Sequence, residues 1–126
     1  MKNESSGHLK RAEELLVVAN ENLEHGHPPD SISRSYFAMV HCATDVLGEF
    51  GIKRSSHHAL WSAFGQYATG EDLLPERFHR YGLDAFSDRS ESDYLWNPTQ
   101  NLEDAEGILE KAREFVAACG EFLENR

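Results

Sequence analysis

The sequence predicts an all-α protein: an up-and-down bundle of about five helices, in a single domain over residues 1–126. Glycines and prolines divide the chain into segments of 16 to 24 residues, which is longer than ordinary strands. Within these segments apolar residues recur every three or four positions, the period of a helix with one buried face. No segment shows the alternation of apolar and polar residues that is typical of strands joined by hairpin turns.

The first two helices are expected on either side of a glycine–proline turn. The first covers about residues 8–25 and ends at Gly26 and the two prolines that follow. Asp30 is expected to cap the second helix, because its carboxylate can accept a hydrogen bond from a free amide of the first turn. This second helix should continue to near Gly51.

The other three helices follow from similar signals. The third is expected from Ser55 or Ser56 to Gly70, and the fourth from about 73 to 94, with Pro75 in its first turn. The last, over 102–124, has the most regular apolar stripe, which indicates packing along its whole length. This stripe consists of Leu102, Ala105, Leu109, Ala112, Val116, Cys119 and Leu123.

Composition excludes several classes of protein. Of the residues, 40% are hydrophobic, which is enough for a folded core and too much for a disordered tail. No apolar run approaches the roughly 20 residues of a membrane span, and the polar N-terminus resembles no secretion signal. The net charge of −10 argues against a protein that coats nucleic acid by charge alone. We therefore expect a cytoplasmic protein without membrane contact, with Cys42 and Cys119 reduced and buried.

Four residues of the second expected helix share a narrow arc, roughly opposite its apolar stripe. They are Arg34, Ala38, His41 and Asp45, at steps of four, three and four. One interpretation is a solvated helix face. The other is a phosphate site, because a guanidinium binds phosphate oxygens in a fork and an imidazole can transfer a proton near neutral pH.

The middle of the chain lacks the acidic excess of the rest. Residues 51–89 contain five basic and five acidic side chains, so the other segments carry the whole net charge of −10. An anion would be repelled least in this neutral stretch, which also contains His57 and His58. Ordinary surface positions remain the alternative interpretation for both histidines.

Several segments together resemble the HEPN family (higher eukaryotes and prokaryotes nucleotide-binding). Residues 30–41, DSISRSYFAMVH, resemble the family's SRaYYAmfH signature, and RSESDY, residues 89–94, is similar to its RxxxDY segment. The resemblance also includes residues 51–53 with the histidines that follow, Phe64, and the acidic last helix. It extends from about residue 30 to residue 123.

This resemblance implies a helical bundle that forms a homodimer and binds a nucleotide or RNA, often beside a small nucleotidyltransferase partner in a toxin–antitoxin-type pair. Many family members are metal-independent ribonucleases, in which an arginine stabilises the scissile phosphate and a histidine four to six residues later moves a proton. Here Arg34 and His41 fit that spacing, although Ser35 follows the arginine where the family has Asn, Asp or His. Alternatively, Arg89 precedes Tyr94, whose side chain, with an ordinary pKa of about 10, is protonated and therefore a poor base at pH 7.

The expected site residues follow from these placements. Arg34 and His41, or Arg89 and Tyr94, are the candidates for catalysis. For nucleotide binding we expect a set drawn from the two family segments and the central histidines, namely Arg34, Tyr36, His57, His58, Arg89 and Asp93.

Metal and cofactor signals are weak. Glu76 and His79 form one Glu-x-x-His spacing, whereas a di-iron bundle needs two. The cysteines form no C-x-x-C pair, and no phosphate-binding glycine loop is present. We expect no metal and no other cofactor. Three hypotheses remain: a nucleotide- or RNA-phosphate-binding module, which we favour, a metal-independent endoribonuclease, and a helical adaptor without a ligand.

Overall fold

The computed structural model describes residues 3–94 and 100–126, with side chains for residues 7–90 and 100–126. All regular secondary structure in these ranges is helical, which confirms the predicted all-α class. The elements are α1 (Asn3–Glu24), α2 (Pro28–Gly48), α3 (His57–Phe64), a π-helical turn η1 (Gly65–Thr69), α4 (Arg77–Tyr94) and α5 (Leu102–Glu124).

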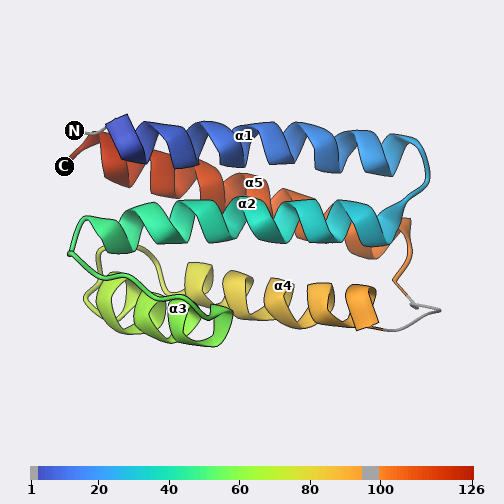
Figure 1. Cartoon of the computed structure of the whole chain (residues 1–126). Helices are drawn as coiled ribbons and strands as arrows, with labels where there is room; N and C mark the ends of the chain where they lie inside the picture. Colours follow the sequence, from blue (N-terminus) through green and yellow to red (C-terminus); the bar gives the residue numbers. More distant parts are fainter. Residues whose placement is uncertain (1–2, 95–99) are drawn as a thin grey trace.

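The four long helices run alternately up and down (Figure 1). Helix α2 lies at the centre and contacts each of the other helices, with its largest interfaces on α1 and α5. Helix α4 lies along the side of α2 away from α1, and α3 lies beside the first turns of α4. Because α2 has neighbours on several sides, residues all round its circumference are buried.

This central position changes the interpretation of the polar arc on α2. Ala38 is fully buried and Asp45 is only 6% exposed, so the arc is not a solvated face. Arg34 is exposed and His41 is half-buried. A hydrogen bond between His41 and His8 shows that α1 lies against this side of α2. Amphipathic periodicity finds one packed face, but it does not show that a second helix covers the opposite face.

Several helix boundaries differ from those expected. Helix α2 begins at Pro28, so Asp30 lies inside its first turn rather than at its cap. The prolines are the reason, since their fixed φ suits the first helical positions and their missing N–H groups cost nothing there. Helix α4 begins at Arg77 rather than near residue 73, after a loop in which Asp72 has a φ of 61°. Helix α5 has the expected bounds, and a capping box between Asn101 and Asp104 begins it.

A cluster of aromatic rings attaches α3 to the bundle. The ring of Phe115, on α5, lies 5.4 Å from Phe64 and 5.9 Å from both Trp61 and Phe78, centroid to centroid. Phe115, Trp61 and Phe64 are fully buried. Gly82, on α4, makes room for the indole, because a Cβ atom at this position would lie 2.3 Å from the Trp61 ring. This packing places the first residue of α3, His57, between α2 and α4.

Candidate functional site

Five residues from three helices meet where α2, α3 and α4 come together. They are Tyr36, Phe37, His57, Phe86 and Arg89, named here the Tyr36 cluster. The His57 ring lies 5.4 Å from Tyr36, 5.8 Å from Phe37 and 6.0 Å from Phe86, centroid to centroid. The guanidinium carbon of Arg89 lies 5.0 Å from the centre of the Phe37 ring, within cation–π range.

The Tyr36 hydroxyl makes two hydrogen bonds, one with His57 of this cluster and one with Trp61, which lies next to it. The indole N–H of Trp61 donates to it at 3.0 Å, and its oxygen lies 2.8 Å from Nδ1 of His57. Burial raises the pKa of Tyr36 to about 12, although the Trp61 hydrogen bond and the charge of Arg89 both act to lower it. The phenol therefore stays protonated at any physiological pH.

The ionisable members of the cluster are neutral or cationic at neutral pH. Burial, followed by the positive charge of Arg89, lowers the pKa of His57 below 6.5, so its imidazole is neutral at pH 7. Arg89 is the charged group that acts on both His57 and Tyr36. A neutral phenol, a neutral imidazole and a permanent cation together favour an anion.

A second histidine pair joins α1 to α2. Nδ1 of His41 lies 2.8 Å from Nδ1 of His8, and the two rings are 5.1 Å apart. Burial lowers the pKa of His41, and the charges of His8 and Arg11 lower it further. Such a bond needs one nitrogen as donor and the other as acceptor, so it is lost when both rings are protonated.

The structure brings together three of the predicted nucleotide-binding residues, Tyr36, His57 and Arg89. Arg34 and His58 are exposed and lie outside the Tyr36 cluster. Arg34 makes no hydrogen bond or ion pair with another described side chain. Seven positions separate it from His41 on the same side of α2, roughly 10 Å along the helix. Asp93 and Tyr94 end α4, but their side chains lie outside the described residues.

Sequence reasoning did not assign Phe37, Phe86, Trp61 or His8 to a site. For Trp61 a signal was present, because it follows His57 by four residues and so shares a face of α3 with it. The same holds for Phe86, which precedes Arg89 by three residues on one face of α4. For His8 the sequence offers no such signal, since its partner His41 comes from another helix. Among the described residues no group of three or more His, Cys, Asp or Glu side chains could hold a metal ion.

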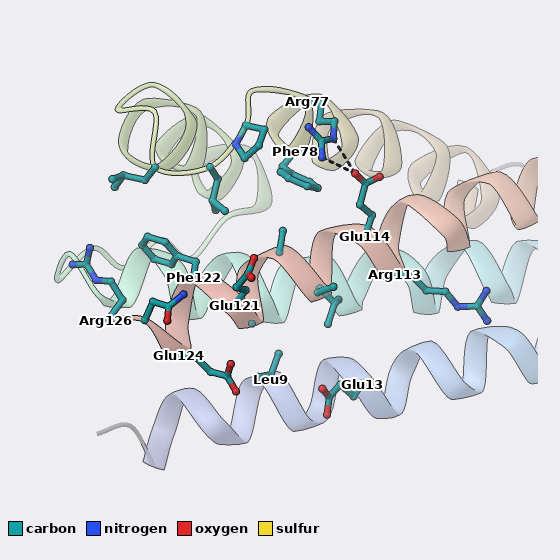
Figure 2. A pocket seen from close by; sticks show the side chains of 18 of the residues that line it. Leu9, Glu13, Arg77, Phe78, Arg113, Glu114, Glu121, Phe122, Glu124 and Arg126 are labelled. Atoms are coloured by element: carbon teal, nitrogen blue, oxygen red, sulfur yellow. Dashed lines mark hydrogen bonds and ion pairs between the residues drawn. The ribbon is translucent and has the colours of Figure 1, made fainter.

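An open groove of about 1290 Å³ lies elsewhere, over the outer side of α5 (Figure 2). Its walls come from α1, from the first turn of α4 and the loop before it, and from α5, and they include Leu9, Leu74 and Phe122. Arg77 contacts Glu114 at its wall, with Nε and Nη2 lying 2.9 and 2.8 Å from Oε2. Of the predicted site residues whose side chains the structure describes, none lines this groove, so its size alone does not make it the functional site.

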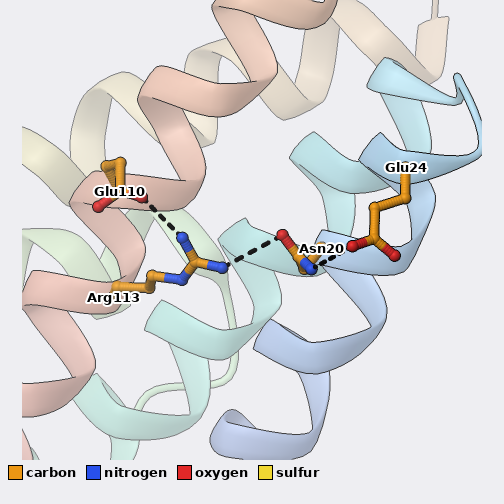
Figure 3. Close-up of polar contacts among 4 residues, drawn as sticks. All are labelled: Asn20, Glu24, Glu110 and Arg113. Atoms are coloured by element: carbon orange, nitrogen blue, oxygen red, sulfur yellow. Dashed lines mark hydrogen bonds and ion pairs between the residues drawn. The ribbon is translucent and has the colours of Figure 1, made fainter.

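Arg113, at the edge of this groove, links α5 to α1 on the surface (Figure 3). It donates to Glu110 at 2.6 Å and to Asn20 at 3.3 Å, and Asn20 in turn donates to Glu24. Exposed pairs of this kind contribute roughly 0–1 kcal/mol each. This network therefore adds little to the stability of the α1–α5 interface, and we do not assign a binding site to it.

Because the pKa values of the half-buried His41 and His57 are lowered, we expect the protein to lose stability as pH falls. The pKa of His41 in the folded protein lies below its ordinary value of 6.5, so the unfolded chain takes up its proton first. Its contribution is therefore fully present above about pH 6.5 and is lost as pH falls through the folded pKa. We expect the urea midpoint to be lower at pH 5.5 than at pH 7.5, a range in which ordinary carboxylates stay ionised.

The variant His41→Gln tests how much of this pH dependence is due to His41. It should reduce the difference between the two pH values without removing it, because the pKa of His57 is lowered in the same direction. Equal urea midpoints at pH 5.5 and 7.5 in the unsubstituted protein would contradict the prediction.

Comparison with known proteins gives one family. The model of the HEPN domain matches residues 5–122. A UPF0332 protein of Gloeobacter violaceus is 32% identical over 116 residues, covering 91% of this chain and 92% of the relative. A "putative toxin" of Methanocaldococcus jannaschii is 29% identical over 109 residues, covering 86% and 80%. A UPF0332 protein of Pyrococcus horikoshii is 33% identical over 82 residues, covering 65% and 58%.

None of the described helices combines the length and apolar character needed to cross a bilayer.

Proposed function

This chain belongs to the HEPN domain family, and on that premise we propose that it binds the phosphate of a nucleotide or RNA through the Tyr36 cluster. In this proposal it is a cytoplasmic homodimer that acts with a small nucleotidyltransferase in a toxin–antitoxin-type pair. The relative from Methanocaldococcus jannaschii, named as a toxin candidate, supports the pairing. The free, buried thiols of Cys42 and Cys119 are consistent with a reducing compartment.

The observation that carries the proposal is the position of Arg89 beside a neutral His57. A guanidinium has five N–H donors, so Arg89 can keep contacts within the protein and still bind two phosphate oxygens. The rings of Phe37 and Phe86 lie against His57 and offer apolar surface for a base or ribose. Arg89 is the charged group that acts on both His57 and Tyr36, so it is the described charge that would attract an anion here.

Substitution of Arg89 tests this proposal. Hydrogen bonds to a charged group contribute about 1.5–3 kcal/mol, so Arg89→Ala should weaken binding by about 10- to 150-fold. Isothermal titration calorimetry with ATP and with a short single-stranded RNA measures the change. Arg80→Ala is the matched control, because Arg80 lies on the same helix, is exposed and makes a long ion pair of 3.9 Å with Asp84.

Arg34→Ala separates the two placements predicted from sequence. If the Tyr36 cluster is the site, this variant should bind as well as the unsubstituted chain. Loss of binding in Arg34→Ala with full binding in Arg89→Ala would move the site to the exposed side of α2 and contradict the proposal.

The assembly is tested by mass and by co-purification. The purified chain should have twice its monomer mass of 14.3 kDa in light scattering. When expressed with its genomic neighbours, it should co-purify with a nucleotidyltransferase. A monomer that captures no such partner would contradict this part of the proposal while leaving the phosphate site in place.

A metal-independent endoribonuclease is the second candidate, favoured by the toxin-candidate relative. In that case the Tyr36 cluster would bind the scissile phosphate and the protein would cleave RNA in the presence of EDTA. RNA left intact from about pH 6 to pH 9, at protein concentrations that saturate binding, would exclude this activity and leave the binding module.

A further inference from the structure

The donor and the acceptor can be assigned in both hydrogen bonds of Tyr36, starting from Trp61. An indole N–H can only donate, so the Tyr36 oxygen is the acceptor in the 3.0 Å contact. The hydroxyl hydrogen of Tyr36 then needs an acceptor of its own. Tyr36 is fully buried, and the nitrogen Nδ1 of His57 lies 2.8 Å away.

The alternative direction leaves a buried donor without a partner. If Nδ1 of His57 carried the proton and donated to Tyr36, the phenol hydrogen would have no acceptor among the described side chains. An unsatisfied buried donor costs about 1–3 kcal/mol, which is enough to exclude the arrangement from the main population. The phenol therefore donates to Nδ1, and the proton of the neutral imidazole is on Nε2.

The other ring nitrogen of His57 is available to a ligand. Nε2 makes no hydrogen bond with any described side chain, and the His57 ring is half-exposed. The two nitrogens of an imidazole point away from each other, so a ring whose Nδ1 faces buried Tyr36 directs Nε2 outward. Arg89 acts on the same ring from α4.

We infer that Trp61 and Tyr36 are positioning residues that hold His57 as a neutral Nε2–H donor, and that His57 and Arg89 together present their donors to one acceptor-only anionic group. The group with this chemistry is a phosphate or phosphodiester, whose non-bridging oxygens accept hydrogen bonds. The ligand part of this inference rests on the proposed function. The direction of the hydrogen bonds from Trp61 through Tyr36 to His57 does not. In this arrangement His57 binds the anion and is not the base that removes a proton from it.

Nuclear magnetic resonance tests the direction of these hydrogen bonds without any ligand. Long-range ¹H–¹⁵N correlation spectra distinguish the two imidazole tautomers, and His57 should be in the Nε2–H form above its pKa. In Tyr36→Phe the donor to Nδ1 is lost, so the two forms should mix and the pKa of His57 should rise. Among the described side chains, the titratable and charged groups shown to act on His57 are Tyr36 from α2 and Arg89 from α4, and only Tyr36 changes here.

Tyr81→Phe is the matched control, since it removes a hydroxyl that donates to Glu114 on the surface and lies outside the cluster. It should leave the His57 spectrum unchanged. An Nδ1–H tautomer in the unsubstituted protein would overturn the inference, whether or not Tyr36→Phe folds.

Binding measurements test whether Nε2–H of His57 donates to the anion together with Arg89. A neutral hydrogen bond contributes roughly 0.5–1.5 kcal/mol, so His57→Ala should weaken binding about 2- to 12-fold. His57→Gln should retain most of the affinity, because its amide N–H can replace Nε2–H. The probes are the dinucleotide UpU, which offers a phosphodiester, and inorganic phosphate; tighter binding of one identifies the source of the anion.

The outcomes separate this inference from the proposed function. Full affinity of His57→Ala for both probes, with Arg89→Ala impaired, would overturn the role of His57 and leave phosphate binding intact. If the unsubstituted protein binds neither these probes nor ATP and single-stranded RNA, the proposed function fails together with the ligand part, while the tautomer result still decides the direction of the hydrogen bonds.

Discussion

Replacing Phe115 with alanine is expected to lower the free energy of unfolding by about 3–5 kcal/mol, the range for truncating a large buried aromatic. Phe115 is fully buried and is the ring on α5 that contacts Trp61, Phe64 and Phe78. Its loss leaves a cavity between α5 and the two helices that carry His57 and Arg89. For a domain with a total stability of about 5–15 kcal/mol, this is a large fraction.

Urea unfolding monitored by circular dichroism measures the effect of Phe115→Ala. Phe122→Ala is the matched control on the same helix, because Phe122 is only partly buried and packs near the end of the chain against Phe50 and Arg126. The control should cost less. Equal losses in the two variants would show that the cluster around Phe115 is not the principal support of α3.

Replacing Gly82 with alanine is expected to cost about 3 kcal/mol, the upper part of the usual range for overpacking a core. The added Cβ would lie 2.3 Å from Cζ3 of Trp61, and the indole cannot withdraw because it is fully buried against Phe64 and Phe115. Either α4 or the indole must shift. Thermal and urea unfolding should both show the loss.

Gly107→Ala is the opposite case within the same chain. Gly107 lies inside α5, and a Cβ there would meet nothing within 4 Å. Alanine should stabilise the helix by about 0.5–1 kcal/mol, through its higher helix propensity and the lower entropy of the unfolded chain. If Gly82→Ala is neutral or stabilising, as expected of Gly107→Ala, close packing of Trp61 on α4 is wrong.

Both destabilising variants should also disturb the candidate site. Helix α3 has eight residues, too few to be stable as an isolated helix in water. Its aromatic contacts therefore hold His57 near Tyr36 and Arg89. Amide hydrogen exchange in α3 should accelerate in Gly82→Ala before the long helices α1 and α2 are affected.

The extent of each helix was predictable to different degrees. Helix α5 has the predicted bounds of 102–124, because a long regular stripe and a capping side chain are local signals. The start of α4 was predicted a turn too early. Leu74 is buried by packing within the loop before α4, so an apolar residue that belongs to the core was taken as the start of a helix.

The sequence alone determined that the chain is helical, roughly where each helix lies and which family it resembles, because period and turn chemistry are properties of neighbouring residues. The tertiary structure decided which side chains meet. Tyr36 and His57 are 21 positions apart, and their contact depends on how α3 packs between α2 and α4. Helical period sets the face on which a residue lies, whereas the helix that covers that face is chosen by packing of the whole core.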